Sequence, residues 1–235
     1  MHQEHVEPHH TGSNARLNSL RAAVLGANDG IVSVAGIVVG VAGATTNRSA
    51  ILAAGLAGLI AGALSMAAGE YVSVSSQRDT ERALLHKERI ELRDFPDEEL
   101  DELIGIYEAK GLSHKTASQV AKELTAHDAF AAHAEAELKI DPNDLNNPWH
   151  AAIASASAFL VGAILPFVTI LVSPVSWRVP ITFLAVLLAL TLTGYLSARV
   201  GDHRKGPAIL RVVIGGAIAM IATYGIGHLV GVKGI

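Results

Sequence analysis

An acidic residue, Asp29, lies inside an apolar stretch that is long enough to span a membrane, residues 22–44. A carboxylate at bilayer depth is costly unless it faces a partner, a cavity or a pathway, so its presence indicates a functional site. A second apolar stretch contains another carboxylate, Glu70, one helical turn after Met66. Two membrane carboxylates, one of them paired with a thioether, suggest a metal cation that passes through a helix bundle.

The elements that must position these residues are membrane-spanning helices. Of the 235 residues, 50% are hydrophobic and only 17% are charged. The apolar residues lie in five long runs, each with roughly the 20 residues that a helix needs to cross the hydrocarbon. We therefore predict an all-α polytopic membrane protein whose spans are residues 22–44, 49–76, 151–172, 179–198 and 209–230.

Lys and Arg residues are concentrated on one side of the predicted spans. Arg16 and Arg21 precede the first span, and residues 77–147 contain many more. The positive-inside rule then places the N-terminus and residues 77–147 in the cytoplasm. The first residues lack the features of a signal peptide, which fits a bacterial plasma membrane.

We therefore predict that the chain has four domains. They are a polar, histidine-containing tail at 1–20, spans one and two at 21–76, a cytoplasmic helical metal-binding domain at 77–147, and spans three to five at 148–235.

The polar segment between spans two and three has the pattern of helices rather than of a loose loop. Residues 77–93 continue the second span without a helix breaker. Pro96, followed by three acidic residues, marks a new helix start, and Gly111 marks a stop. Ser113 can cap a third helix, which we expect to run to Leu138. The prediction is a cytoplasmic subdomain of three helices.

This subdomain carries two pairs of glutamates with a spacing of three, which places both members of each pair on one helix face. A hairpin of the first two helices could bring the pairs together, and a histidine and a glutamate one turn apart on the third helix could complete a site. Carboxylate oxygens with an added imidazole suit iron(II) or manganese(II). A solvated acidic face is the alternative explanation of the same spacing. The candidate ligands are Glu88, Glu91, Glu99, Glu102, His133 and Glu137.

Several function classes find no support in the sequence. The absence of cysteine excludes disulfides, thiolate metal sites and thiol catalysis. A net charge of -4, with no basic patch interleaved with aromatic residues, argues against nucleic-acid binding. No phosphate-binding glycine loop or nucleophile-and-base arrangement is present, and the predicted cytoplasmic helices lack the Glu-x-x-His motif of di-iron enzymes. We therefore predict a non-enzyme without an organic cofactor, whose tail could collect metal through His2, His5, His9 and His10.

Two motifs carry a resemblance to a known family. They are NDGIVS at residues 28–33 and SMAAGEYVS at residues 65–73, followed by the Glu-rich insert and three more spans. In this order and at this separation, the chain resembles the vacuolar iron transporter family over nearly its whole length. The resemblance implies a homodimer that exports iron(II), often also manganese(II), from the cytoplasm in exchange for protons. It also implies a translocation path between the subunits, lined by the first two spans.

The same resemblance implies roles for individual residues. Asp29 is similar to the family's membrane carboxylate, Met66 to a thioether ligand of the same path, and Glu70 lies near its cytoplasmic mouth. In one departure, His133 and Ala134 stand where plant members carry two adjacent methionines, and His133 could be a replacement ligand. The residues that match the family's cytoplasmic metal-binding domain are Glu88, Glu91, Glu99, Glu102 and Glu137.

The leading hypothesis is therefore a proton-coupled secondary transporter of Fe²⁺ or Mn²⁺, embedded in the lipid bilayer. Membrane carboxylates suit this coupling because they can hold a proton and a metal ion in turn. The alternative is a membrane-anchored metal sensor or buffer, in which the cytoplasmic helices bind metal and nothing crosses the membrane.

Overall fold

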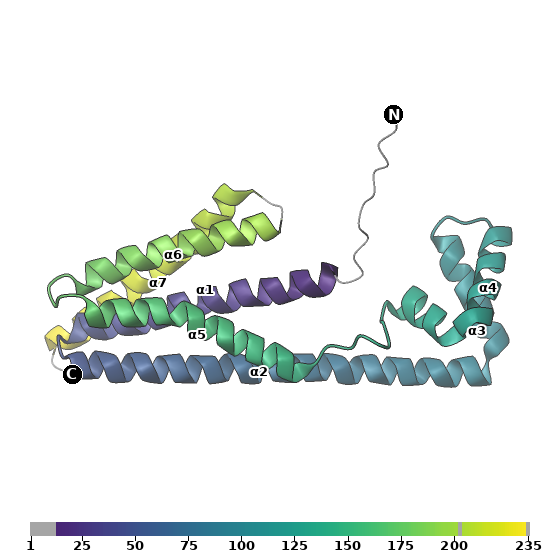
Figure 1. Ribbon diagram of the computed structural model, residues 1–235, viewed down its shortest axis with the longest axis horizontal. Coiled ribbons are helices and arrows are strands. Elements are labelled where there is room, and N and C mark those ends of the chain that lie inside the picture. Colours follow the sequence, from purple (N-terminus) through teal and green to yellow (C-terminus); the bar gives the residue numbers. More distant parts are fainter. Residues whose placement is uncertain (1–12, 202–203, 234–235) are drawn as a thin grey trace, which may run out of the picture. The chain divides into compact units, whose positions relative to one another are not determined.

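The computed structural model of the chain describes residues 13–201 and 204–233. This part is almost entirely helical and contains no β-strand, which confirms the prediction of an all-α protein (Figure 1). In chain order, the elements are α1 (Ser13–Ala44), α2 (Arg48–Asp94), α3 (Pro96–Ala109), α4 (His114–His133), the π-helix η1 (Ala134–Leu138), α5 (Pro148–Val172), α6 (Arg178–Val200) and α7 (Lys205–Lys233).

The chain divides into two compact units. The first unit contains α1, the part of α2 up to Tyr71, and α5, α6 and α7. The second unit, residues 72–148, contains the rest of α2 together with α3, α4 and η1. α2 is one unbroken helix of 47 residues, so its apolar first part continues directly into the polar residues from Gln77 onwards, as predicted.

Five helices of the described chain are long and apolar enough to cross a membrane, which confirms the predicted number of spans. The shortest of them has 22 residues and therefore rises about 33 Å, enough for a hydrocarbon layer of about 30 Å. α2 is longer than a span requires, and its polar second part lies outside the apolar run. The apolar helices are Ala23–Ala44, Arg48–Asp94, Pro148–Val172, Arg178–Arg199 and Lys205–Gly231.

α1 is the central helix of the first unit. It contacts both α6 and α7, and its span is more deeply buried than any of the other four. Apolar side chains of all five spanning helices form one core around it. The helix that carries Asp29 is therefore held firmly from several sides. Fully buried members of this core include Val34, Val38, Ile51, Phe159, Val186, Leu190 and Met220.

Glycines allow α1 and α5 to pack backbone against backbone. A Cβ atom added at Gly30 would overlap the carbonyl oxygen of Phe159, and one added at Gly162 would overlap that of Ala27. Only glycine permits such a close approach of two spanning helices. The contact turns one face of α1 towards α5 and fixes the direction in which the neighbouring Asp29 points.

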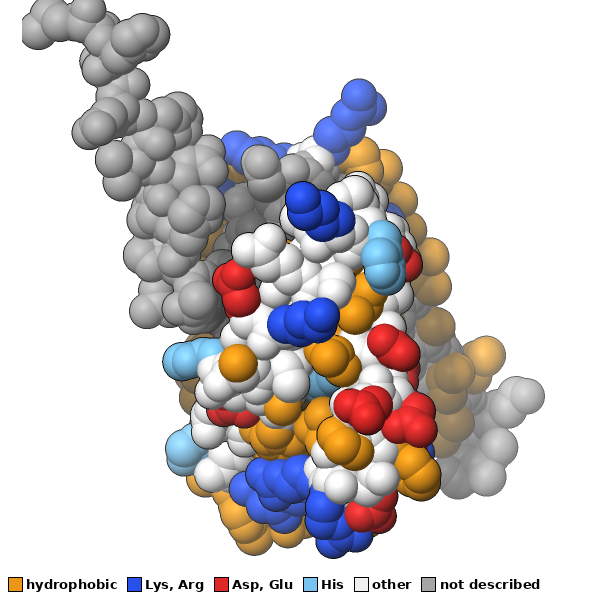
Figure 2. All heavy atoms as spheres, turned by 90° about the vertical axis from the view of Figure 1, so that its right-hand side faces the viewer, with side chains coloured by type: hydrophobic (Ala, Val, Ile, Leu, Met, Phe, Trp, Pro, Cys, Tyr) orange, Lys and Arg blue, Asp and Glu red, His pale blue; other side chains and the backbone are white. Residues whose placement is uncertain are grey.

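The second unit is built around a small apolar core between α3 and α4. Pro96 begins α3, three acidic residues fill its first turn, and Gly111 (φ 98°) follows its end, as the sequence predicted. The Ser113 side chain accepts a hydrogen bond from the Thr116 backbone N–H, which confirms the predicted cap of α4. Figure 2 shows Lys, Arg, Asp, Glu and His side chains spread over the visible face of this unit. The buried apolar residues of the core are Leu103, Ile104, Ala117, Ala121, Ala132 and Ala136.

The prediction of one continuous helix from Ser113 to Leu138 is wrong. Asp128 has non-helical backbone angles (φ −160°, ψ 96°), and its side chain accepts a hydrogen bond of 2.9 Å from the Ala131 backbone N–H. This is the geometry of an N-cap, so the chain stops one helix and starts another at this residue. The last turn then widens into η1 and ends at Lys139, which is left-handed (φ 56°).

Candidate metal-binding sites

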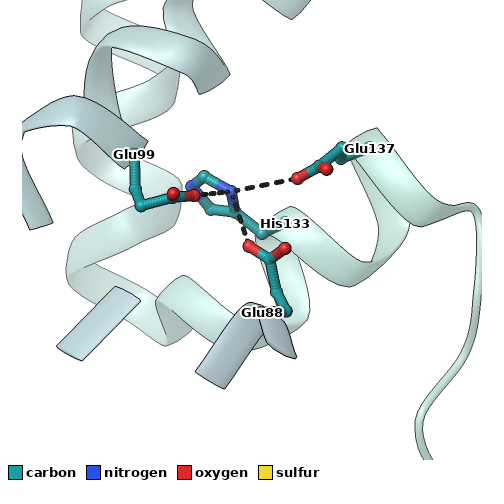
Figure 3. Close-up of side chains that lie close together, drawn as sticks. All are labelled: Glu88, Glu99, His133 and Glu137. Atoms are coloured by element: carbon teal, nitrogen blue, oxygen red, sulfur yellow. Dashed lines mark ion pairs between the residues drawn. The ribbon is translucent and has the colours of Figure 1, made fainter. Parts of the chain in front are cut away.

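Four titratable side chains of the second unit converge on one point. Figure 3 shows three carboxylates arranged around the imidazole of His133. The Nδ1 atom of His133 lies 3.0 Å from an oxygen of Glu88, 3.4 Å from one of Glu99 and 3.8 Å from one of Glu137. His133 and Glu88 are almost completely buried, at 0% and 2% exposure. We call these four residues the glutamate–histidine cluster.

Each member of the cluster comes from a different element. Glu88 lies on the polar part of α2, Glu99 in the first turn of α3, His133 at the end of α4, and Glu137 within η1. The helix restart at Asp128 and the wider π turn set the orientation of the last two residues. A uniform α-helix through this region would present them differently.

Burial and like charges change the pKa values in the cluster. Burial raises the pKa of the Glu88 carboxyl to about 7, and the negative charges of Glu137 and Glu99 act in the same direction. Burial also raises the pKa of Glu99, aided by the charge of Glu102. The pKa of His133 is lowered, because burial disfavours its charged form more than the nearby carboxylates favour it. Near neutral pH the cluster therefore offers a neutral imidazole and a carboxyl group that is ready to lose its proton.

The donor set fits a divalent metal ion. One ligand atom from each of the four residues lies within 4.8 Å of the others. Ligands on opposite sides of an ion with bonds of 2.1 to 2.4 Å are roughly 4.2 to 4.8 Å apart. Both ring nitrogens of His133, and one oxygen each of Glu88 and Glu137, are buried without a hydrogen-bond partner. An unsatisfied buried polar group costs about 1–3 kcal/mol. A cation held by the carboxylates and one ring nitrogen of His133 would remove this cost for the atoms that coordinate it.

Two of the candidate ligands lie outside this cluster. Glu91 forms an ion pair of 2.9 Å with Lys87 on the same helix, and Glu102 is exposed. Their negative charges nevertheless contribute to the raised pKa of Glu99. The structure therefore brings together one glutamate of each predicted pair, with the other glutamate of each pair close enough to act through its charge.

A pocket of about 560 Å³ in the first unit brings together two of the three residues predicted for a pathway. Asp29 from α1 and Met66 from α2 both line it, whereas Glu70 does not. Asp29 is exposed on the single chain. Asn28 also lines the pocket, and its side-chain oxygen is buried without a hydrogen-bond partner. The pocket thus offers a carboxylate, an amide oxygen and a thioether, a mixed set that borderline-soft cations accept.

Sequence reasoning missed three residues at these sites. Arg211 of α7 lines the pocket with Asp29. It lies within the fifth apolar stretch, so the rule that an intramembrane charge indicates a functional site could have identified it as well. Asn28 belongs to the NDGIVS motif, but the sequence alone did not indicate it as a ligand. Asp128 gave a signal as well, because an aspartate in a helical pattern can act as a cap. The histidines of the N-terminal tail lie outside the described residues.

Comparison with known proteins places these features in a family. The model of the VIT family matches residues 20–228, which include the pocket and the cluster. The chain belongs to the VIT family. It is 42% identical over 212 residues to a vacuolar iron transporter of Acanthamoeba castellanii, an alignment that covers 89% of this chain and 78% of the relative.

Plant relatives are also similar over most of the chain. A vacuolar iron transporter homolog 1 of Oryza sativa subsp. japonica is 37% identical over 222 residues, covering 94% of this chain and 78% of the relative. A vacuolar iron transporter homolog 2.1 of Arabidopsis thaliana is 36% identical over 217 residues, covering 92% and 83%. All three carry the names of transporters rather than of enzymes, which agrees with the prediction that this chain is not an enzyme.

Proposed function

We propose that this VIT family member is a secondary transporter that moves Fe²⁺ or Mn²⁺ out of the cytoplasm in exchange for protons. The observation that carries the proposal is the pocket in which Asp29 and Met66 lie together among spanning helices. A carboxylate in this position is costly unless a cation or an aqueous path uses it. The names of the relatives support a metal ion as the cargo.

The glutamate–histidine cluster is the collecting site in this proposal. Lys and Arg are more numerous in residues 77–147 than in the segments on the opposite side of the predicted spans, which supports a cytoplasmic location for the cluster. The released ion then enters the membrane near Glu70, which lies one helical turn beyond Met66 on α2, and reaches Asp29 and Met66. Protons compete with the metal for the same carboxylates, which couples the two fluxes. A bacterial plasma membrane remains the proposed location.

Flux measurements in proteoliposomes test the proposal directly. Full-length protein should carry Fe²⁺ or Mn²⁺ across the bilayer at a rate that rises with an opposing pH gradient. Protein-free liposomes and collapse of the gradient by a protonophore are the controls. A rate that matches protein-free liposomes for both metals at every pH gradient would contradict transport.

A metal sensor or buffer is the second candidate function, and the cluster is the observation that favours it. Its four ligand atoms lie within 4.8 Å of each other without any contribution from the membrane pocket. In this case the purified protein binds Mn²⁺ but the liposomes show no flux. The two functions are therefore separated by the same flux experiment combined with a binding measurement.

The single chain leaves Asp29 exposed, and this supports the proposed homodimer. A carboxylate that faced lipid would be strongly unfavourable, so a second copy is the natural cover for this face. Leu25 lines the same pocket and is 64% exposed, whereas Leu188 of α6 is 63% exposed away from the pocket. These two positions make a matched pair, since the chain has no cysteine of its own.

We expect a short bis-maleimide cross-linker to join two chains of the Leu25→Cys variant in native membranes. The Leu188→Cys variant should stay monomeric on denaturing gels under the same conditions. Light scattering of the wild type in detergent should give the mass of two chains. A monomer mass, or equal cross-linking at both positions, would speak against a dimer that covers Asp29.

A further inference from the structure

Arg211 gives the Asp29 pocket a balanced charge. It lies on α7 and lines the same pocket, and among the lining residues that the structure describes these two alone are charged. A guanidinium keeps its positive charge at every pH that the protein meets. In the described part of the chain, no ion pair within 4 Å joins Arg211 to Asp29, and neither side chain has a hydrogen-bond partner of its own. The two charges therefore share one pocket without being locked together.

The position of Arg211 on α7 allows its head group to move. α7 begins at Lys205, so the Arg211 backbone lies about 9 Å from the helix start. Long basic side chains near a helix end extend readily towards the aqueous interface. One turn further along α7, Gly215 also lines the pocket, and a Cβ atom there would meet nothing within 4 Å. The pocket is therefore open at the turn of α7 that follows Arg211.

We propose that Arg211 is the resident counter-charge of the Asp29 pocket. Its guanidinium balances Asp29 while no metal ion is in the pocket, and it withdraws towards the start of α7 when a divalent cation enters. Asp29 is then never left as an isolated charge at bilayer depth, and the returning guanidinium helps to expel the cation. This inference rests on the proposed transport function, and it adds a positioning residue that sets how tightly the pocket holds its cargo.

Thermal melting of the full-length protein in lipid nanodiscs, with all metal removed by chelator, tests the charge balance without any transport. The variants Asp29→Asn and Arg211→Gln each leave one unbalanced charge, whereas the double variant leaves none. We expect the double variant to melt at a higher temperature than either single variant. The proposal would be overturned if the change in Tm of the double variant equalled the sum of the two single changes, or if none of the variants changed Tm. The matched control is Arg204→Gln, an exposed residue outside the pocket, whose effect should simply add to that of Asp29→Asn.

Mn²⁺ uptake into proteoliposomes tests the effect on the cargo. Without the competing charge, Arg211→Gln should hold Mn²⁺ more tightly and release it more slowly, so KM and kcat should both fall by roughly tenfold. Arg211→Lys keeps the charge and should stay near the wild type. A kcat that falls while KM is unchanged or raised would indicate a structural role only. If the wild type carries neither Mn²⁺ nor Fe²⁺, the transport function fails, and the melting experiment still decides whether the two charges are balanced.

Discussion

We expect Asp29→Asn to reduce metal flux through proteoliposomes by at least about 100-fold. The substitution keeps the shape of the side chain and removes its charge. Two unit charges 4 Å apart attract each other by about 4 kcal/mol near a protein surface, and the attraction for a divalent ion is larger. The pocket would then offer the cation only the thioether of Met66 and neutral oxygens. The measurement is the initial rate of Mn²⁺ or Fe²⁺ uptake at a fixed pH gradient.

The controls separate loss of transport from loss of folding or of metal binding. Asp79→Asn removes an exposed carboxylate from α2 outside the pocket and should transport like the wild type. Asp29→Asn should still bind Mn²⁺ at the glutamate–histidine cluster, because the cluster takes all its ligands from the second unit. Flux within a factor of two of the wild type would refute the role given to Asp29. A loss of Mn²⁺ binding as well would point to misfolding instead.

Much of the helical architecture could be predicted because it follows from local signals. A run of about 20 apolar residues has few other uses, so the number of spans was clear from the sequence. Pro96 and Ser113 act on their immediate neighbours, and both helix starts occur where these residues predicted them. The unbroken passage from the apolar to the polar part of α2 was also predictable, since no glycine or proline interrupts residues 77–93.

The missed features depend on three-dimensional context. Asp128 lies in a stretch whose alanines favour a continuous helix, and only its own cap hydrogen bond reveals the break. The glutamate pairs had a symmetrical spacing, yet Glu88 and Glu99 turn inwards while Glu91 pairs with Lys87. Which member of a pair faces its neighbours depends on how α2, α3 and η1 pack together, and spacing within one helix does not contain that information.

Arg211 is a residue of the pocket that sequence reasoning did not identify. Intramembrane charge was considered for Asp29 but not for Arg211, although Arg211 also lies inside a predicted span, residues 209–230. Its place in the Asp29 pocket depends on the packing of α7 against α1. The glycines of α1 pack against α5 and α7, and their spacing in the sequence does not say which helix each one faces.

Below about pH 7, we expect the affinity of the glutamate–histidine cluster for Mn²⁺ to rise by about tenfold for each unit by which the pH increases. Above about pH 7, the affinity should level off. Burial raises the pKa of Glu88 to about 7, so the metal must displace one proton from this carboxyl at lower pH. His133 has a lowered pKa and is already neutral in this range, so it adds little to the pH dependence. Titration of Mn²⁺ into full-length protein, followed by electron paramagnetic resonance, measures the effect.

The stability of the metal-free protein should depend on pH through the same group. With its pKa raised from 4.5, folded Glu88 holds more protons than the unfolded chain between about pH 4.5 and 7. As the pH rises through this window, the free energy of unfolding therefore decreases. Above pH 6.5 His133 is neutral in both the folded and the unfolded state, so it does not oppose the decrease that Glu88 causes. Added Mn²⁺ should raise Tm more at pH 8 than at pH 6.

Substitutions at two glutamates decide whether Glu88 is the titrating group. Glu88→Gln imitates the protonated carboxyl, so it should bind Mn²⁺ weakly and lose the dependence of both affinity and Tm on pH between 6 and 8. Glu135→Gln changes an exposed glutamate of η1 outside the cluster and should keep both dependences. If Glu88→Gln kept the tenfold change in affinity per pH unit, the proton would belong to another group, and the cluster would have to collect its cation without Glu88 as the exchanging carboxyl.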